Sequence, residues 1–155
     1  MSNTDLTAAD VAFLERTLEL AVRAGELGNR PFGALIVSAN GDELAEGINQ
    51  ATSSASVIAH AEIDAITQTA SPAALIGATV YASGEPCPMC SAALVWAGVH
   101  RVVFAAAEPD FRALLPKGPR FALSCREVIA SSGQDIEVVG PSLGTEALRP
   151  FGRAA

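Results

Sequence analysis

The alternation of apolar and polar residues predicts a helix followed by a hairpin at the start of the chain. Apolar residues recur at helical spacing over 11–22, after Thr7 and Asp10, which have the spacing of a capping box. The unbroken apolar run 33–37 predicts a buried strand. An Asn-Gly-Asp turn then predicts a hairpin to a partner strand over 44–50.

Helical and strand patterns continue to alternate further along the chain. The spacing predicts helices over 58–69 and 87–97, and strands over 78–82 and 100–106. Such alternation indicates a sheet with helices on its faces, in which helical crossovers join parallel strands. The sequence therefore predicts an α/β fold.

The C-terminal part has a weaker pattern. It predicts a helix over 123–131 and a short strand over 136–139. Residues 141–155 form an arm whose path the pattern does not define. We interpret residues 1–155 as one domain that ends in this arm.

Composition and cysteine usage narrow the class of protein. The chain has 155 residues, of which 50% are apolar, so it can bury a substantial core. No window has the uninterrupted apolar length that a membrane span requires, and no membrane partner is expected. A Cys-x-x-Cys pair among only three cysteines is typical of metal binding or catalysis in a reducing compartment. We therefore expect a soluble, cytoplasmic protein.

The charge balance bears on the kind of partner. The formal net charge is −7, whereas nucleic-acid binding usually leaves a basic surface, to which Lys117 and Arg120 come nearest here. A small-molecule substrate is therefore favoured over a nucleic acid.

Two short segments carry the candidate chemistry, and each lies where a strand or loop leads into a helix. Cys87 and Cys90 are three residues apart, so on a first helical turn their sulfurs reach one point, and the helix N-terminus favours their thiolate forms. His60 and Glu62 would diverge on a regular helix, so they can share a site only beyond its N-terminal end. One imidazole and two thiolates suit zinc, so His60, Cys87 and Cys90 are the predicted ligands.

Glu62 is the predicted catalytic residue. Three protein ligands leave the fourth position of tetrahedral zinc for water, as in catalytic zinc sites. Two thiolates weaken the acidifying effect of zinc on that water, so a nearby base should help. The Glu62 carboxylate can take a proton from the water, pass it to a ring nitrogen and protonate the departing ammonia.

The combination of His-x-Glu with Pro-Cys-x-x-Cys is the signature of zinc deaminases. The chain resembles the cytidine deaminase-like superfamily. Its segments 31–34, 60–62 and 85–90, together with Asn49, resemble the bacterial guanine deaminase branch, of which the tRNA adenosine deaminases are close relatives. The resemblance covers roughly residues 10–106 and is weak in the tail.

The resemblance implies a three-layer α/β/α sandwich with a five-stranded mixed sheet, one Zn²⁺ per chain and a homodimer. It also implies hydrolytic deamination of a free nucleobase-like heterocycle, with conversion of guanine to xanthine and ammonia as the first choice. Aminopyrimidines, aminotriazines and cytosine-type rings are alternative substrates. Deamination of adenosine to inosine in tRNA is the alternative from another class, and the acidic composition argues against it.

The resemblance also assigns substrate contacts. Asn49 matches the asparagine that hydrogen-bonds the base, and Ala61 matches the residue whose backbone contacts it. Phe32 and Trp96 match apolar positions near the pocket. In guanine-type enzymes a carboxylate from the C-terminal part often reads the amidine edge.

Asp110 and Glu127 are the candidates for that carboxylate, and the choice between them stays open. The segment 150–151 resembles a tail that can cap the pocket.

Other interpretations of these residues do not require catalysis. A structural zinc site would need a fourth ligand, for which Cys125 or His100 could serve, although neither has ligand-like spacing. Cys125 is expected to be a small buried residue, and Glu85 no more than a loop residue before proline. A redox pair or a non-catalytic, zinc-stabilised binding domain would use the same cysteines.

Overall fold

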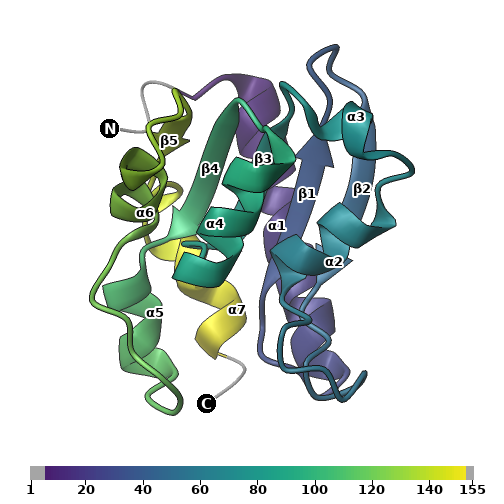
Figure 1. Ribbon diagram of the computed structural model, residues 1–155. Coiled ribbons are helices and arrows are strands. Elements are labelled where there is room, and N and C mark those ends of the chain that lie inside the picture. The colour runs from purple at the N-terminus through teal and green to yellow at the C-terminus, as the bar shows by residue number, and fades with distance from the viewer. Residues whose placement is uncertain (1–5, 153–155) are drawn as a thin grey trace.

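The computed structural model describes residues 6–152, whose strands form one mixed sheet (Figure 1). The five strands have the order β2-β1-β3-β4-β5. β1 pairs antiparallel with β2 and β3, whereas β3, β4 and β5 run parallel to one another. The strand bounds are β1 Gly33–Val37, β2 Glu43–Ile48, β3 Thr79–Gly84, β4 Arg101–Ala106 and β5 Glu137–Val139.

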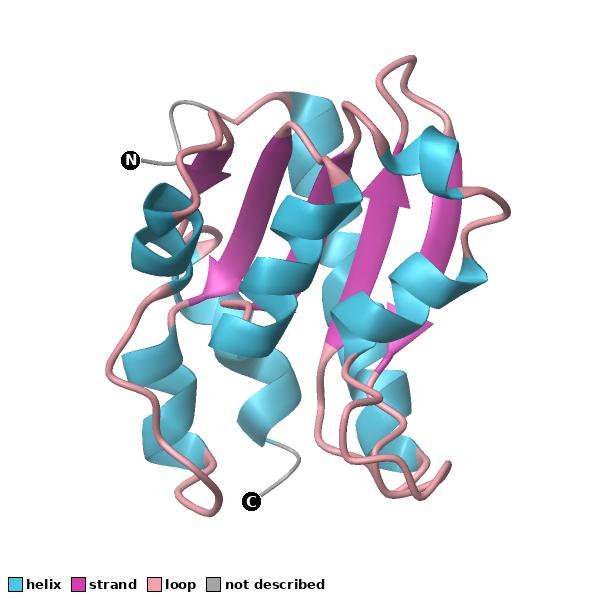
Figure 2. Cartoon of the chain, in the orientation of Figure 1, coloured by secondary structure: helices cyan, strands magenta, loops and turns pink. Residues whose placement is uncertain are grey.

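Helices cover both faces of this sheet (Figure 2). On one face, α2, α4 and α6 bury a core against the sheet, and on the other α1, α5 and α7 do so. The helix bounds are α1 Ala8–Glu26, α2 Ala61–Gln68, α3 Pro72–Leu75, α4 Pro88–Ala97, α5 Glu108–Leu114, α6 Cys125–Ser131, the 3₁₀ helix η2 Gly144–Leu148 and α7 Arg149–Gly152.

The two cores explain why β1 is an unbroken apolar run. Successive side chains of a strand point to opposite faces. Ala34 and Ile36 therefore enter the core beneath α2 and α4, while Leu35 and Val37 enter the core beneath α1. All five residues of β1 are buried, as expected for a strand covered on both faces.

The predicted α/β class, the five-stranded mixed sheet and the three layers are confirmed. The helix predicted over 58–69 begins at Ala61, because His60 is its N-cap and has an extended conformation. The short helices α3, of four residues, and α5, of seven, were not predicted. Within the arm predicted over 141–155, the described part contains η2 and α7, and residues 153–155 lie outside the described residues.

None of the helices in the described part of the chain is long and apolar enough to cross a membrane.

Candidate metal and catalytic site

The predicted zinc ligands meet where the N-termini of α2 and α4 come together. His60 is the N-cap of α2 and Cys87 is the N-cap of α4, and both have extended backbone conformations. Neither side chain caps its own helix, although N-cap side chains commonly do. Both side chains are therefore available for another partner.

A glycine in β2 allows α2 to approach the sheet closely. A Cβ at Gly47 would lie 2.2 Å from the carbonyl oxygen of Ala61 and 2.5 Å from the backbone nitrogen of Ala65. Any side chain at position 47 would therefore push the first turn of α2, and with it the site, away from the sheet.

The donor atoms of His60, Cys87 and Cys90 form a compact group, with all three within 4.8 Å of one another. The Nδ1 atom of His60 lies 3.6 Å from the Sγ atoms of both Cys87 and Cys90. Tetrahedral zinc with Zn–S bonds of about 2.3 Å and Zn–N bonds of about 2.0 Å separates sulfur from nitrogen by about 3.5 Å, close to the observed spacing. The donor set and its spacing therefore fit zinc.

The ionisation of the two thiols also fits a cation. Hydrogen bonding from Cys90 and His60 outweighs burial and lowers the pKa of Cys87 to about 4. The same contact with Cys87, together with burial, raises the pKa of Cys90 far above its usual range. Without a cation the pair thus carries one negative charge, and a divalent ion at the group would favour a second.

Glu62 is placed beside this group in the first turn of α2. It is 6% exposed, and burial, followed by the negative charge of Cys87, raises the pKa of its carboxyl to about 7. The ion pairs between arginines and carboxylates in the described residues all lie elsewhere. A buried carboxyl with a pKa near neutrality is suited to accept and return a proton.

Three predicted substrate contacts lie close to the site in the chain and in the fold. Ala61 is buried in the first turn of α2. Asn49 is buried at the end of β2, where its Oδ1 accepts a hydrogen bond from the backbone of Ala51, while no described group accepts one from its Nδ2. The backbone nitrogen of Asn49 donates to the carbonyl oxygen of Phe32 at 3.0 Å.

The other three residues predicted to contact the substrate do not lie beside the metal-ligand group. Trp96 is 90% exposed near the C-terminal end of α4, about two helical turns from Cys90. Glu127 is exposed and accepts a hydrogen bond from the backbone of Ser124 in a capping box of α6. Asp110 is exposed in the first turn of α5.

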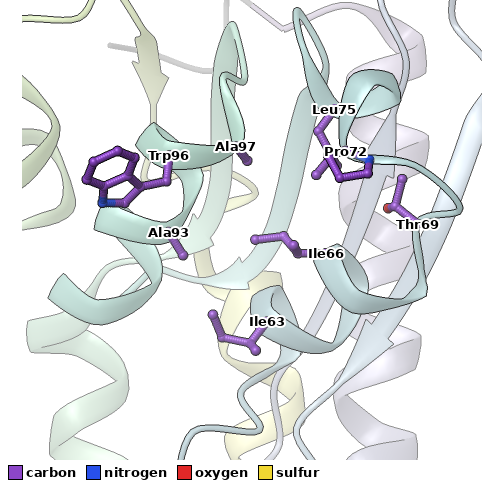
Figure 3. Close-up of a pocket in the computed structure, with 8 residues that line it drawn as sticks. All are labelled: Ile63, Ile66, Thr69, Pro72, Leu75, Ala93, Trp96 and Ala97. Atoms are coloured by element: carbon purple, nitrogen blue, oxygen red, sulfur yellow. The ribbon is translucent and has the colours of Figure 1, made fainter.

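Trp96 instead borders an apolar groove between α2, α3 and α4, which we call the α2–α4 groove (Figure 3). Its indole points away from the isoleucines of α2 in this view. The groove is lined by Ile63, Ile66, Thr69, Pro72, Leu75, Ala93, Trp96 and Ala97.

Neither nominated fourth ligand belongs to the donor group. Within residues 6–152 the group that could hold a metal consists of His60, Cys87 and Cys90. Cys125 is buried in the core, where burial raises its pKa to about 11, and His100 is exposed at the start of β4. The closed, four-ligand structural site therefore lacks a ligand in the described residues.

The sequence did not reveal that three aromatic rings meet, two of them against Gly84 at the end of β3. Phe111 of α5 and Phe151 of α7 stack with ring centroids 5.4 Å apart, and each packs edge-on against Phe32. Phe111 had no signal, because α5 itself was not predicted. Phe151 lies in the segment 150–151 that the family resemblance had suggested as a cap.

Comparisons with known proteins agree with this geometry. Residues 7–106 match the model of the cytidine and deoxycytidylate deaminase zinc-binding region. A protein named probable cytosine deaminase, from Schizosaccharomyces pombe, is 33% identical over 97% of this chain and 94% of its own length. The guanine deaminase of Bacillus subtilis is 40% identical over 63% of this chain and 65% of its own length. The tRNA-specific adenosine deaminase of the same organism is 38% identical over 64% and 63%, respectively.

Solved structures share the fold. A guanine deaminase from Nitrosomonas europaea has a TM-score of 0.79 and 25% identity, over 96% of this chain and 85% of that chain. A structure of NE0047 in complex with 2,6-diaminopurine has a TM-score of 0.78 and 27% identity, over 96% of this chain and 82% of that chain.

Proposed function

Because the chain belongs to the zinc-binding cytidine and deoxycytidylate deaminase family, whose members hydrolyse C–N bonds, we propose that it deaminates a free purine base. The preferred reaction is the conversion of guanine to xanthine with release of ammonia. The observation that carries this proposal is the group of three zinc-type donors with a buried Glu62 beside it that has no arginine or lysine partner among the described residues.

Each residue of the group has a distinct part in the proposed reaction. His60, Cys87 and Cys90 would hold a zinc ion, which supplies Lewis acidity and lowers the pKa of water. The Glu62 carboxylate takes a proton from the attacking water and donates it to a ring nitrogen. It then takes a second proton from the hydroxyl on the tetrahedral carbon and donates it to the amine, which leaves as ammonia. The pKa of about 7 allows Glu62 to serve as both base and acid near neutral pH.

Two observations support a free heterocycle as substrate. The Nδ2 group of Asn49 is a donor without a partner among the described residues, and such a group can bind a ring nitrogen or oxo group. In addition, NE0047 has been solved with 2,6-diaminopurine. The net charge of −7 gives no support to a tRNA substrate.

The whole-length match to the yeast relative supports a cytosine-type ring as the second candidate. Cytosine, like guanine, carries its amino group on a carbon next to a ring nitrogen, so it would need the same zinc ligands and the same Glu62. Only the groups that contact the rest of the ring would differ.

A panel of substrates tests both candidates. Ammonia release is measured with guanine, adenine, cytosine, cytidine, ammeline and an anticodon stem-loop, with Glu62→Gln as the control. We expect turnover of guanine that Glu62→Gln abolishes. Turnover of cytosine alone would favour the second candidate, and turnover of the stem-loop alone would overturn the proposal of a free base.

The proposal treats residues 1–155 as one deaminase domain that acts in the cytoplasm. A single sheet contributes to both cores, which supports one domain. All three cysteines are free, and two of them must stay reduced to bind zinc, which supports a reducing compartment.

We also propose that the chain forms a homodimer through the α2–α4 groove. In a symmetric pair the same surface serves both partners, so an exposed aromatic residue beside an apolar groove can complement its own copy. Trp96 and the groove meet this requirement (Figure 3). Sedimentation is expected to show a dimer that Trp96→Lys converts to a monomer, and a monomeric wild-type protein would contradict the proposal.

A further inference from the structure

Glu85, which the sequence suggested was only a loop residue, connects two helices to the loop before the zinc ligands. Its Oε1 accepts a hydrogen bond from the backbone nitrogen of Glu108, the first residue of α5, at 3.0 Å. Its Oε2 accepts one from the backbone nitrogen of Cys125, the first residue of α6, at 3.0 Å. One carboxylate two residues before Cys87 therefore caps both helices, which lie along the same edge of the molecule (Figure 1).

This long-range cap compensates for a missing local one. The first backbone N–H groups of a helix have no partner within the helix, and a nearby negative charge is favourable there. The N-cap of α5 is Ala107, whose side chain cannot accept a hydrogen bond. The N-cap of α6, Ser124, accepts from Glu127, so the nitrogen of Cys125 is left to Glu85.

One of the two helices that Glu85 caps, α5, carries Phe111. The rings of Phe111 and Phe32 together form a surface that we call the Phe32–Phe111 wall. Phe111 follows Glu108 by one turn of α5, and its ring lies 5.2 Å from that of Phe32. Both rings press on Gly84, where a Cβ would lie 2.8 Å from Phe32 and 3.2 Å from Phe111. Glu85 is next in the chain, so its carboxylate holds α5 at the place where the two rings meet the backbone.

The Phe32–Phe111 wall in turn adjoins the residue expected to bind the base. The backbone carbonyl of Phe32 accepts the hydrogen bond from the backbone of Asn49, and Asn49 is 3% exposed. A shift of α5 would therefore move Phe32 and with it the backbone that positions Asn49.

We propose that Glu85 is a positioning residue of the deaminase, which joins α5 and α6 to the zinc-ligand loop and thereby fixes the Phe32–Phe111 wall beside Asn49. The inference rests on the proposed function, because it assigns to that wall a part in binding the heterocycle. Glu85 itself touches neither the substrate nor the metal ligands' donor atoms in this assignment.

Glu85→Gln is the sharpest change at this position. Glutamine has the same shape, but only one of its two terminal atoms accepts hydrogen bonds. Its NH₂ group would therefore face one of the two backbone N–H donors, and either α5 or α6 would lose its connection to the loop. Ser124→Ala is the matched control, since it removes the local cap of α6 and leaves both bonds of Glu85 in place.

A second variant separates positioning from stability. Ala107 has the extended conformation of an N-cap and Asp110 lies three residues later, so Ala107→Ser would create a capping box like that of Thr7 and Asp10. Glu85→Gln combined with Ala107→Ser should regain the stability of α5 without regaining its attachment to the loop. This double variant also provides a folded protein if Glu85→Gln alone is insoluble.

The test measures KM, kcat, zinc content and thermal midpoint on whichever heterocycle the wild-type protein turns over. We expect Glu85→Gln to raise KM about tenfold, because small displacements of binding groups are costly, with kcat and zinc content within about twofold of wild type. Ser124→Ala should keep the wild-type KM. The double variant should regain the thermal midpoint and keep the raised KM.

The outcomes separate this inference from the proposed function. An unchanged KM in Glu85→Gln, or a KM that Ala107→Ser restores together with stability, would overturn the positioning role. Loss of zinc with an unchanged KM would also overturn it. If the wild-type protein turns over none of the heterocycles, the proposed function fails first.

Discussion

Two buried carboxylates at opposite ends of the parallel strands, one with a structural role and one with a proposed catalytic role, have different surroundings. Asp10 is 3% exposed and lies by Arg101, where β4 begins, and Glu62 is 6% exposed and lies beside the cysteines that follow the end of β3. Their exposure is nearly equal. Their surroundings are opposite, and so are the shifts of their pKa values.

Asp10 is fully partnered. Arg101 donates to both of its oxygens at 2.8 and 3.0 Å, Tyr81 donates to Oδ1 at 2.6 Å, and the backbone of Thr7 donates to Oδ2 at 2.9 Å. Burial alone would raise the pKa of Asp10, but these hydrogen bonds outweigh it and hold the pKa well below its usual range. The network joins the start of α1 to β3 and β4.

Glu62 has no arginine or lysine partner in the described residues, and its nearest charged neighbours are the candidate metal ligands. Burial, followed by the negative charge of Cys87, raises the pKa of Glu62 to about 7, although His60 and a hydrogen bond with Cys90 act in the opposite direction. A buried charge that serves only the fold is expected to be compensated, because an unpaired one is costly. A buried carboxyl left without an arginine or lysine partner is thus a candidate for proton transfer.

The largest expected effect comes from Glu62→Gln. Removing the proton-transfer group should lower kcat about 10²- to 10⁴-fold. The stability of the zinc-loaded protein should not fall, because the change removes a buried charge that has no ion-pair partner. Ammonia release, metal analysis and urea unfolding check this. Wild-type kcat, or a large loss of stability, would place Glu62 in the same structural class as Asp10.

Asp10→Asn should have the reverse effect. It leaves the Arg101 guanidinium without its buried partner, and breaking such a pair typically costs about 3–5 kcal/mol. The zinc content and kcat of the folded variant should match wild type, since the network lies at the far end of the strands. Urea unfolding measures the free energy of unfolding. If kcat falls by more than the fraction of folded protein does, Asp10 affects catalysis as well as stability, which would contradict the prediction.

The zinc-ligand group and the Asp10 network also differ in how much of each could be predicted from the sequence. The zinc ligands and Glu62 lie in two contiguous motifs, so spacing alone placed them on two helix starts. Asp10, Tyr81 and Arg101 come from three distant elements, and no local pattern reveals that they meet. The capping box of Thr7 and Asp10 was predicted correctly, but the tertiary partners of Asp10 were not.

The same distinction explains the rest of the site. Glu85 accepts hydrogen bonds from backbone nitrogens 23 and 40 residues away. The residue types at those two positions therefore give no indication of the contact. The contacts assigned to Trp96, Asp110 and Glu127 by resemblance remain predictions, and the structure places all three on exposed positions. The sheet was easier to predict, because buried strands leave long apolar runs.

The pH dependence of stability should distinguish the carboxylates by sign. The folded pKa of Asp10 lies below its unfolded value of about 4, so its contribution is present above that pH and is lost on acidification through the folded pKa. In metal-free protein the folded pKa of Glu62, about 7, lies above its unfolded value, so stability is lost as pH rises from about 4 to that value.

Unfolding curves recorded from acidic to neutral pH test this. In a plot of the free energy of unfolding against pH, Asp10→Asn should reduce the slope at acidic pH. Metal-free Glu62→Gln should reduce the slope between about pH 4 and 7. Parallel curves for wild type and both variants would contradict opposite contributions.

Tyr81→Phe should have the smallest effect and shows how much of the Asp10 network one neutral donor provides. The variant loses the bond from the Tyr81 hydroxyl to Oδ1 of Asp10 and keeps the ring contact with Phe13, whose centroid is 5.1 Å away. A hydrogen bond to a charged group contributes about 1.5–3 kcal/mol, and the lower value is expected because Arg101 still compensates Asp10. Urea unfolding should show a loss smaller than that of Asp10→Asn, with kcat unchanged. An equal or greater loss would mean that the hydroxyl, and not the guanidinium, is the partner on which the buried Asp10 charge depends.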